Sequence, residues 1–134
     1  MSEAVGKKTI LVVDDEPEIR KLVSAMVSQF GYKVLTADSG EHALTLYRNQ
    51  HEPLEMLITD VVAPGMSGPM LADKLSELQP DLKVLYISGY DNTHVVQTYV
   101  VEKGHELLAK PFAVDELKAK ISELLHRPAK AIRA

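Results

Sequence analysis

The sequence has no cysteine, no long apolar run and no excess of positive charge. Without cysteine, disulfides and thiolate metal sites are excluded. No run approaches the roughly 18 apolar residues of a membrane span, and residues 1–8 lack the apolar core of a signal peptide. A formal charge of −4 and a pI near 5.7 argue against the broad basic surface of a nucleic-acid binder. We therefore expect a cytoplasmic protein that binds neither nucleic acid nor membrane.

The length and composition fit one domain. The chain has 134 residues, of which 46% are hydrophobic and 25% are charged, enough to bury a core without disulfides or metals as staples. We expect the domain to occupy residues 8–126, after a flexible N-terminus at 1–7. A C-terminal tail follows at 127–134, and its few basic residues are too sparse to make a binding patch.

Apolar, β-rich runs alternate with segments of helical periodicity along the whole chain. The expected strands are residues 9–13, 33–37, 56–60, 84–87 and 106–109. The expected helices are residues 17–30, 39–49, 67–78, 92–102 and 114–125. Strict alternation predicts an α/β fold, with a doubly wound parallel sheet of five strands covered by helices on both faces.

Three details of these helices are expectations that a structure can check. Asp15 stands where a cap of the first helix would lie, and the third helix turns four side chains to the core. These four are Met70, Leu71, Leu75 and Leu78. The segment 92–102 is rich in β-branched residues, which are weak helix formers. Because a crossover between parallel strands requires a helix there, we predict one that shifts easily.

Polar residues follow the apolar runs at the ends of four predicted strands. These residues are Asp14, Asp15, Asp60, Ser88 and Lys110. In a doubly wound sheet the carboxyl ends of the strands share one edge, so these residues can form one site. Three carboxylates that close repel one another unless a cation neutralises them, and Mg²⁺ prefers such oxygen ligands. One carboxylate could then act as a nucleophile on a phosphoryl group, with a lysine balancing charge.

Each of these signals is weak by itself. An Asp-Asp pair before a helix is more often a cap and turn, Ser88-Gly89 is more often a loop start, and Lys110 before proline is more often a solvated lysine. Their joint occurrence on matching strand ends outweighs these readings.

With these motifs the sequence resembles the receiver domains of two-component signalling, from Thr9 to about Leu125. The likeness is carried by Leu-Val-Val-Asp14-Asp15-Glu16-Pro17, Thr59-Asp60 with Pro64-Gly65-Met66-Ser67-Gly68, Ile87-Ser88-Gly89-Tyr90, and Ala109-Lys110-Pro111-Phe112. The resemblance implies a flavodoxin-like fold with strand order 2-1-3-4-5. The residues from Val61 to Gly68 and the sequence Ser88-Gly89-Tyr90 are especially similar to receivers attached to hybrid sensor kinases.

The resemblance also implies a role for each site residue. Asp60 would be the phosphoacceptor, taking a phosphoryl group from a phosphohistidine on a histidine kinase or a histidine phosphotransfer protein. Asp15 and Asp60 would bind Mg²⁺ with the backbone carbonyl of Val62, while Asp14 would act mainly through bound water. Ser88 would hydrogen-bond the phosphoryl group, and Lys110 would pair with it through a cis Lys110-Pro111 peptide.

Such a domain is a signalling module that catalyses only its own phosphorylation and dephosphorylation. It acts through a changed surface, which we expect on the fourth helix, fifth strand and fifth helix, where a weak homodimer could also form. By the same resemblance, Val62 and Tyr90 would flank the path of an attacking water, and their bulk predicts slow self-hydrolysis. Two positions depart from the family pattern: Leu107 stands where an aromatic switch is common, and Ala63 stands where methionine is frequent.

Three other readings remain open. A phosphohydrolase with an aspartyl phosphate typically has a second aspartate two residues after the nucleophile, where this chain has Val62. A nucleotide or flavin binder would need a glycine-rich phosphate loop after a strand, and none is present. The main alternative is a receiver-like interaction domain that acts without phosphorylation, although an intact set of five site residues argues against it.

Overall fold

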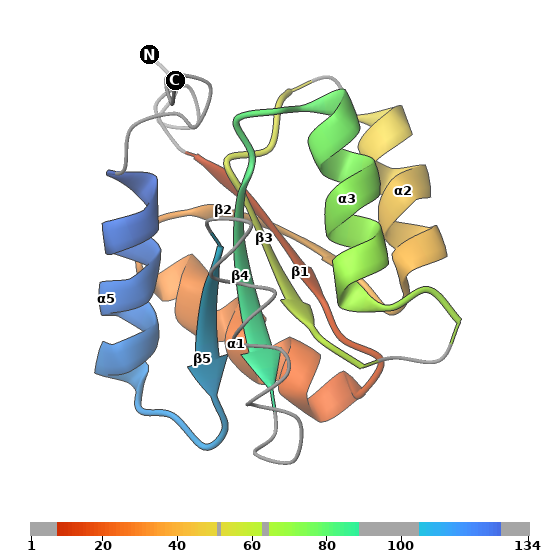
Figure 1. Ribbon diagram of the computed structural model, residues 1–134. Coiled ribbons are helices and arrows are strands. Elements are labelled where there is room, and N and C mark those ends of the chain that lie inside the picture. The colour runs from red at the N-terminus through yellow and green to blue at the C-terminus, as the bar shows by residue number, and fades with distance from the viewer. Residues whose placement is uncertain (1–7, 51, 63–64, 89–104, 127–134) are drawn as a thin grey trace.

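The β-rich runs form a five-stranded parallel sheet in the order β2-β1-β3-β4-β5 (Figure 1). The computed structural model describes residues 8–50, 52–62, 65–88 and 105–126. The strands are β1 (Thr9–Val13), β2 (Lys33–Ala37), β3 (Met56–Asp60), β4 (Lys83–Ser88) and β5 (Glu106–Ala109). The predicted parallel sheet and its strand order are confirmed.

Helices cover both faces of this sheet, as the alternation predicts (Figure 1). One face carries α1 (Pro17–Gln29) and α5 (Val114–Leu125), and the other carries α2 (Gly40–Asn49) and α3 (Gly68–Leu78). The helix predicted at 92–102 lies outside the described residues. No described helix is long and apolar enough to cross a membrane.

The sheet separates two apolar cores. Alternate side chains of the central strands face opposite sides, so Leu11 and Leu57 pack toward α2 and α3, while Ile10 and Ile58 pack toward α1 and α5. Each of these side chains is at most 1% exposed. Burial on both faces explains why these strands read as continuous apolar runs in the sequence. It also makes the sheet a rigid base for residues at the strand ends.

Local chemistry sets the helix ends. Ser39 and Ser67 accept hydrogen bonds from the third backbone N–H beyond them and cap α2 and α3. Gly31 follows α1 with φ of 101°, a conformation that glycine adopts without strain. The expected cap at Asp15 is wrong: the N-cap of α1 is Glu16. Its backbone N–H donates to the Asp14 side chain, 2.9 Å away, so the first aspartate of the pair stabilises this turn.

The prediction that four side chains of α3 face the core is half right. Leu71 and Leu75 are buried, but Met70 is 52% exposed and Leu78 is 57% exposed. Met70 lies roughly 100° around the helix from Leu71, which turns it away from the sheet. Leu78 is the last residue of α3, where the helix ends at the margin of the core.

Candidate functional site

The register of the strands brings the predicted site residues to one level of the sheet. Val13 pairs with Thr59 on β3, and Ser88 pairs with Ala109 on β5. The residues one step further along these strands are Asp14, Asp60 and Lys110. The backbone N–H of Lys110 donates to the carbonyl of Ser88 at 2.8 Å, which ties the last two strand ends together.

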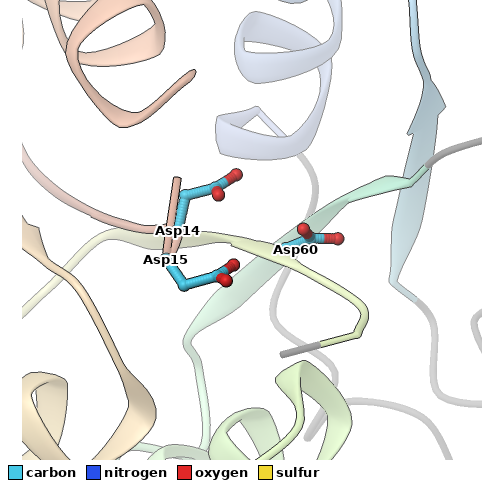
Figure 2. Close-up of side chains that lie close together, drawn as sticks. All are labelled: Asp14, Asp15 and Asp60. Carbon is cyan, nitrogen blue, oxygen red and sulfur yellow. The ribbon is translucent and has the colours of Figure 1, made fainter. Parts of the chain in front are cut away.

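Three carboxylates meet at this edge. One oxygen each from Asp14, Asp15 and Asp60 lies within 4.8 Å of the other two. Figure 2 shows Asp14 and Asp15 on consecutive positions after β1, with Asp60 beside them at the end of β3. Asp14 is only 4% exposed, whereas Asp15 is open to solvent. The cluster is therefore buried at one side and accessible at the other.

Hydrogen bonds hold Asp14 from three directions. Its backbone N–H donates to the carbonyl of Ala37 on β2, 3.2 Å away. One oxygen of its carboxylate, Oδ1, accepts the Glu16 N–H, and its carbonyl accepts the Arg20 guanidinium Nη1 at 2.8 Å. The aspartate pair thus sits on a fixed turn between β1 and α1.

Lys110 supplies positive charge to the cluster. Its Nζ lies 3.9 Å from Oδ2 of Asp60 and 3.9 Å from Oε1 of Glu16. The expected cis peptide between Lys110 and Pro111 is present. The side chains of Lys110 and Asp60 are 26% and 16% exposed, so this pair is only partly screened by water.

The environment raises the pKa of two of the carboxyls. Burial is the main cause of the raised pKa of Asp14, and the charges of Asp60 and Asp15 add to it, while the Glu16 N–H and Lys110 oppose it. Burial also raises the pKa of Asp60, against the lowering effects of Lys110 and of the Val61 and Val62 backbone N–H groups. The ionised forms of these two carboxyls are therefore incompletely stabilised by the surrounding protein.

These residues fit a hard divalent cation. Carboxylate oxygens are the ligands that Mg²⁺ prefers, and three acids against one lysine leave an excess of negative charge. The carbonyl of Val62 as a further ligand stays a prediction. So does the role of the Ser88 hydroxyl, although Ser88 is buried at the same edge. Gly89, Tyr90, Ala63 and Pro64 lie outside the described residues.

Sequence reasoning missed the contributions of three residues. Glu16 shares Lys110 with Asp60, and Arg20 holds the Asp14 carbonyl. Gly68 appears in the sequence only as the last residue of the motif that follows Asp60, yet a Cβ on it would lie 2.1 Å from the carbonyl oxygen of Asp60. A glycine placed shortly after the central aspartate was the one available signal for this close approach.

Leu107 stands on β5 at the position where receiver domains commonly have an aromatic switch residue. Its side chain packs against the core on the α2 and α3 side. Its register partner on β4 is Tyr86, a fully buried ring in that same core. An aromatic side chain therefore lies beside this position, on the neighbouring strand.

The chain matches a known protein family over most of its length. The family model described as the response regulator receiver domain matches residues 10–122. The response regulator receiver protein CpdR of Brucella abortus is 32% identical over 118 residues, which are 88% of this chain and 97% of CpdR. The probable transcriptional regulator ycf27 of Cyanophora paradoxa is 34% identical over 92% of this chain, but this chain spans only 50% of that protein.

Two further matches are to a sensor kinase and to a solved structure. The sensor kinase CckA of Brucella abortus is 30% identical over 91% of this chain, in a stretch that is 13% of the kinase. The solved response regulator protein TrrA of Thermotoga maritima, in complex with Mg²⁺-BeF, superposes with a TM-score of 0.75 and 33% identity. That match covers 87% of this chain and 98% of TrrA.

Proposed function

This chain belongs to the response regulator receiver domain family, and on that premise we propose that Asp60 is its phosphoacceptor. Receiver domains are the phosphoacceptor signalling modules of two-component systems, and in general they are not enzymes. The observation that carries the assignment is the cluster at the strand ends. Three carboxylates lie within 4.8 Å of one another, and Lys110 lies 3.9 Å from Asp60.

The reaction that this geometry supports is a displacement at phosphorus. A carboxylate oxygen of Asp60 forms a bond to the phosphorus of a partner's phosphohistidine, and the bond from phosphorus to the imidazole nitrogen breaks. The imidazole leaves with the electron pair and takes up one proton, and the product is an aspartyl phosphate. Bound Mg²⁺ would supply positive charge for the phosphoryl oxygens, and Asp14, Asp15 and Asp60 would hold it.

Lys110 has a role both before and after phosphoryl transfer. At rest its ammonium balances the charge of Asp60 and Glu16. Once the phosphoryl group is attached, the same ammonium is within reach of its oxygens, and the Ser88 hydroxyl approaches from the end of β4. Charge-assisted hydrogen bonds of this kind are stronger in a partly buried site than in water.

Partner and boundaries complete the proposal. The phosphoryl donor is a histidine kinase or a histidine phosphotransfer protein, and the phosphorylated domain signals through a changed surface. A weak homodimer through the fourth helix, β5 and α5 is part of the same proposal, although the fourth helix lies outside the described residues. The domain extends over residues 8–126.

Two alternatives are less well supported. An interaction domain that never takes up phosphate would have no need for the complete set of acids, lysine and buried serine found here. A phosphohydrolase would need a second acid where Val62 presents an apolar side chain that is 60% exposed. On this proposal the domain promotes its own phosphorylation and dephosphorylation.

Intact-protein mass spectrometry tests the proposal. The protein is mixed with phosphoramidate and Mg²⁺, beside the variant Asp60→Asn and the control Asp81→Asn. Asp81 is an exposed acid before β4, at the opposite edge of the sheet. We expect one phosphoryl adduct on the wild type and on Asp81→Asn, and none on Asp60→Asn or without Mg²⁺. An adduct that survives in Asp60→Asn would refute the assignment.

A further inference from the structure

Arg20 lies next to the acid cluster without being part of it. It is the fourth residue of α1, and its Nη1 donates to the backbone carbonyl of Asp14 at 2.8 Å. Its own backbone N–H donates to the Glu16 carbonyl at 2.9 Å, which fixes the base of the side chain in the helix. Arg20 therefore spans the connection from the end of β1 to α1.

The carbonyl that accepts the Arg20 hydrogen bond lies between two aspartates of the acid cluster. It belongs to the planar peptide unit that joins Asp14 to Asp15. A rotation of that unit changes the direction in which the two side chains leave the backbone, and therefore the distance between their carboxylates. The Arg20 bond opposes such a rotation at the carbonyl, while the Ala37 carbonyl and the Glu16 N–H are hydrogen-bonded to the backbone N–H and the side chain of Asp14.

Arg20 does not act mainly as a counter-charge. Within the described part of the chain, no carboxylate oxygen lies within ion-pair distance of its guanidinium, whereas Lys110 pairs with both Asp60 and Glu16. The contact that Arg20 makes is with a neutral carbonyl. Its effect on the cluster is therefore expected to be geometric.

We propose that Arg20 is a positioning residue, which holds the peptide between Asp14 and Asp15 so that the acid cluster is preorganised for a divalent cation. This inference rests on the function proposed above and adds a residue to it. Residues that orient metal ligands through hydrogen bonds commonly change metal affinity by about 10-fold to 100-fold when they are replaced.

The test measures Mg²⁺ affinity by isothermal titration calorimetry on the whole chain. Arg20→Met keeps much of the packing and removes the donor, while Arg20→Lys keeps a cationic donor on a long side chain. Lys21→Met is the matched control, because it removes one positive charge at the next, exposed position of the same helix. Thermal unfolding without Mg²⁺ is recorded for each variant.

We expect Arg20→Met to weaken Mg²⁺ binding by about 10-fold, Arg20→Lys to restore most of the affinity, and Lys21→Met to match the wild type. Equal affinity of Arg20→Met and wild type would overturn the proposal, even if the variant melts at a lower temperature, since that result indicates a purely structural residue. An equal loss in Lys21→Met would also overturn it, because charge alone would then account for the effect.

If Arg20→Met does not fold, Arg20→Gln is measured in its place. The glutamine amide is too short to span the connection from α1 to the Asp14 carbonyl. The same weakening is expected, and unchanged affinity contradicts the proposal. The phosphoramidate reaction of the wild type distinguishes failure of the proposed function from failure of the role proposed for Arg20. A wild type that binds no Mg²⁺ and forms no adduct refutes the proposed function, whereas an adduct with normal Mg²⁺ binding in the Arg20 variants refutes only the role of Arg20.

Discussion

Gly68 is the position where a single added methyl group should lower both the stability of the protein and the rate of phosphorylation. A Cβ at this position would lie 2.1 Å from the Asp60 carbonyl oxygen and 3.2 Å from Cγ2 of Thr59. The Asp60 carbonyl also accepts the Thr59 hydroxyl at 3.0 Å, and Gly68 donates its own N–H to the Val61 carbonyl at 3.0 Å. The backbone on both sides is therefore held in place, and Gly68→Ala must displace one side by roughly 1 Å to relieve the contact.

Two losses follow from this displacement. Overpacking of this kind typically costs about 1–3 kcal/mol of unfolding free energy. For a chain of this length 2 kcal/mol corresponds to a fall of about 7 °C in Tm. Because the displaced backbone belongs to the phosphoacceptor, a shift of that size is also expected to slow phosphorylation by roughly 10-fold to 100-fold.

Gly31→Ala is the matched control. Gly31 has φ of 101° with nothing within 4 Å of an added Cβ, so the substitution costs backbone strain of about 1–2 kcal/mol without a clash. It precedes β2, at the sheet edge opposite the site. The assays are thermal unfolding by circular dichroism and the time course of the phosphoramidate adduct per folded molecule. Normal phosphorylation in Gly68→Ala, or an equal loss in Gly31→Ala, would refute the reasoning.

Three further predictions concern charge and metal. Lys110→Met should slow adduct formation by about 100-fold through lost stabilisation of phosphoryl charge while Mg²⁺ still binds; an unchanged time course would exclude that role. Mg²⁺ at about ten times its Kd should add about 1.4 kcal/mol, or about 5 °C in Tm, to the wild type. Asp14→Asn should lose most of that gain in the same thermal scan, and a full gain in the variant would contradict the metal assignment. The raised pKa of Asp60 means that the folded state holds its proton more tightly than the unfolded chain does, so the stabilisation present at low pH is lost as pH rises through the folded pKa. Without Mg²⁺, Asp60→Asn should therefore be more stable than the wild type at pH 8, by about 1 kcal/mol, and this gap should close toward pH 4 in urea titrations; a gap that widens toward acid would contradict it.

The sheet and the level of its strand ends could be predicted because they depend on patterns that the sequence carries directly. Apolar runs such as residues 10–13 and 84–87 are long enough to mark buried strands, and alternation with helices leaves few topologies. The position of Asp60 at a strand end then follows from counting residues. The strand order and the detailed site roles came from resemblance to receiver domains.

Other features depend on the three-dimensional positions of individual side chains, which sequence patterns do not define. The reach of Arg20 to the Asp14 carbonyl requires the angle between β1 and α1, which no periodicity contains. The exposure of Met70 depends on how α3 rotates against the sheet, and a stripe of apolar residues fixes that rotation only to within a residue or so. The approach of Gly68 to Asp60 likewise appears only when the loop is closed.

The central claim is that the phosphoryl group is carried by Asp60, and chemical trapping tests it most directly. An acyl phosphate is reduced by borohydride to an alcohol, so an aspartyl phosphate becomes homoserine at the modified position. The protein is phosphorylated by phosphoramidate with Mg²⁺, treated with borohydride, digested and sequenced by mass spectrometry. We predict homoserine at position 60 alone, and its loss when Mg²⁺ is removed. Homoserine at position 14 or 15, or a phosphorylated protein that yields no homoserine, would contradict the account.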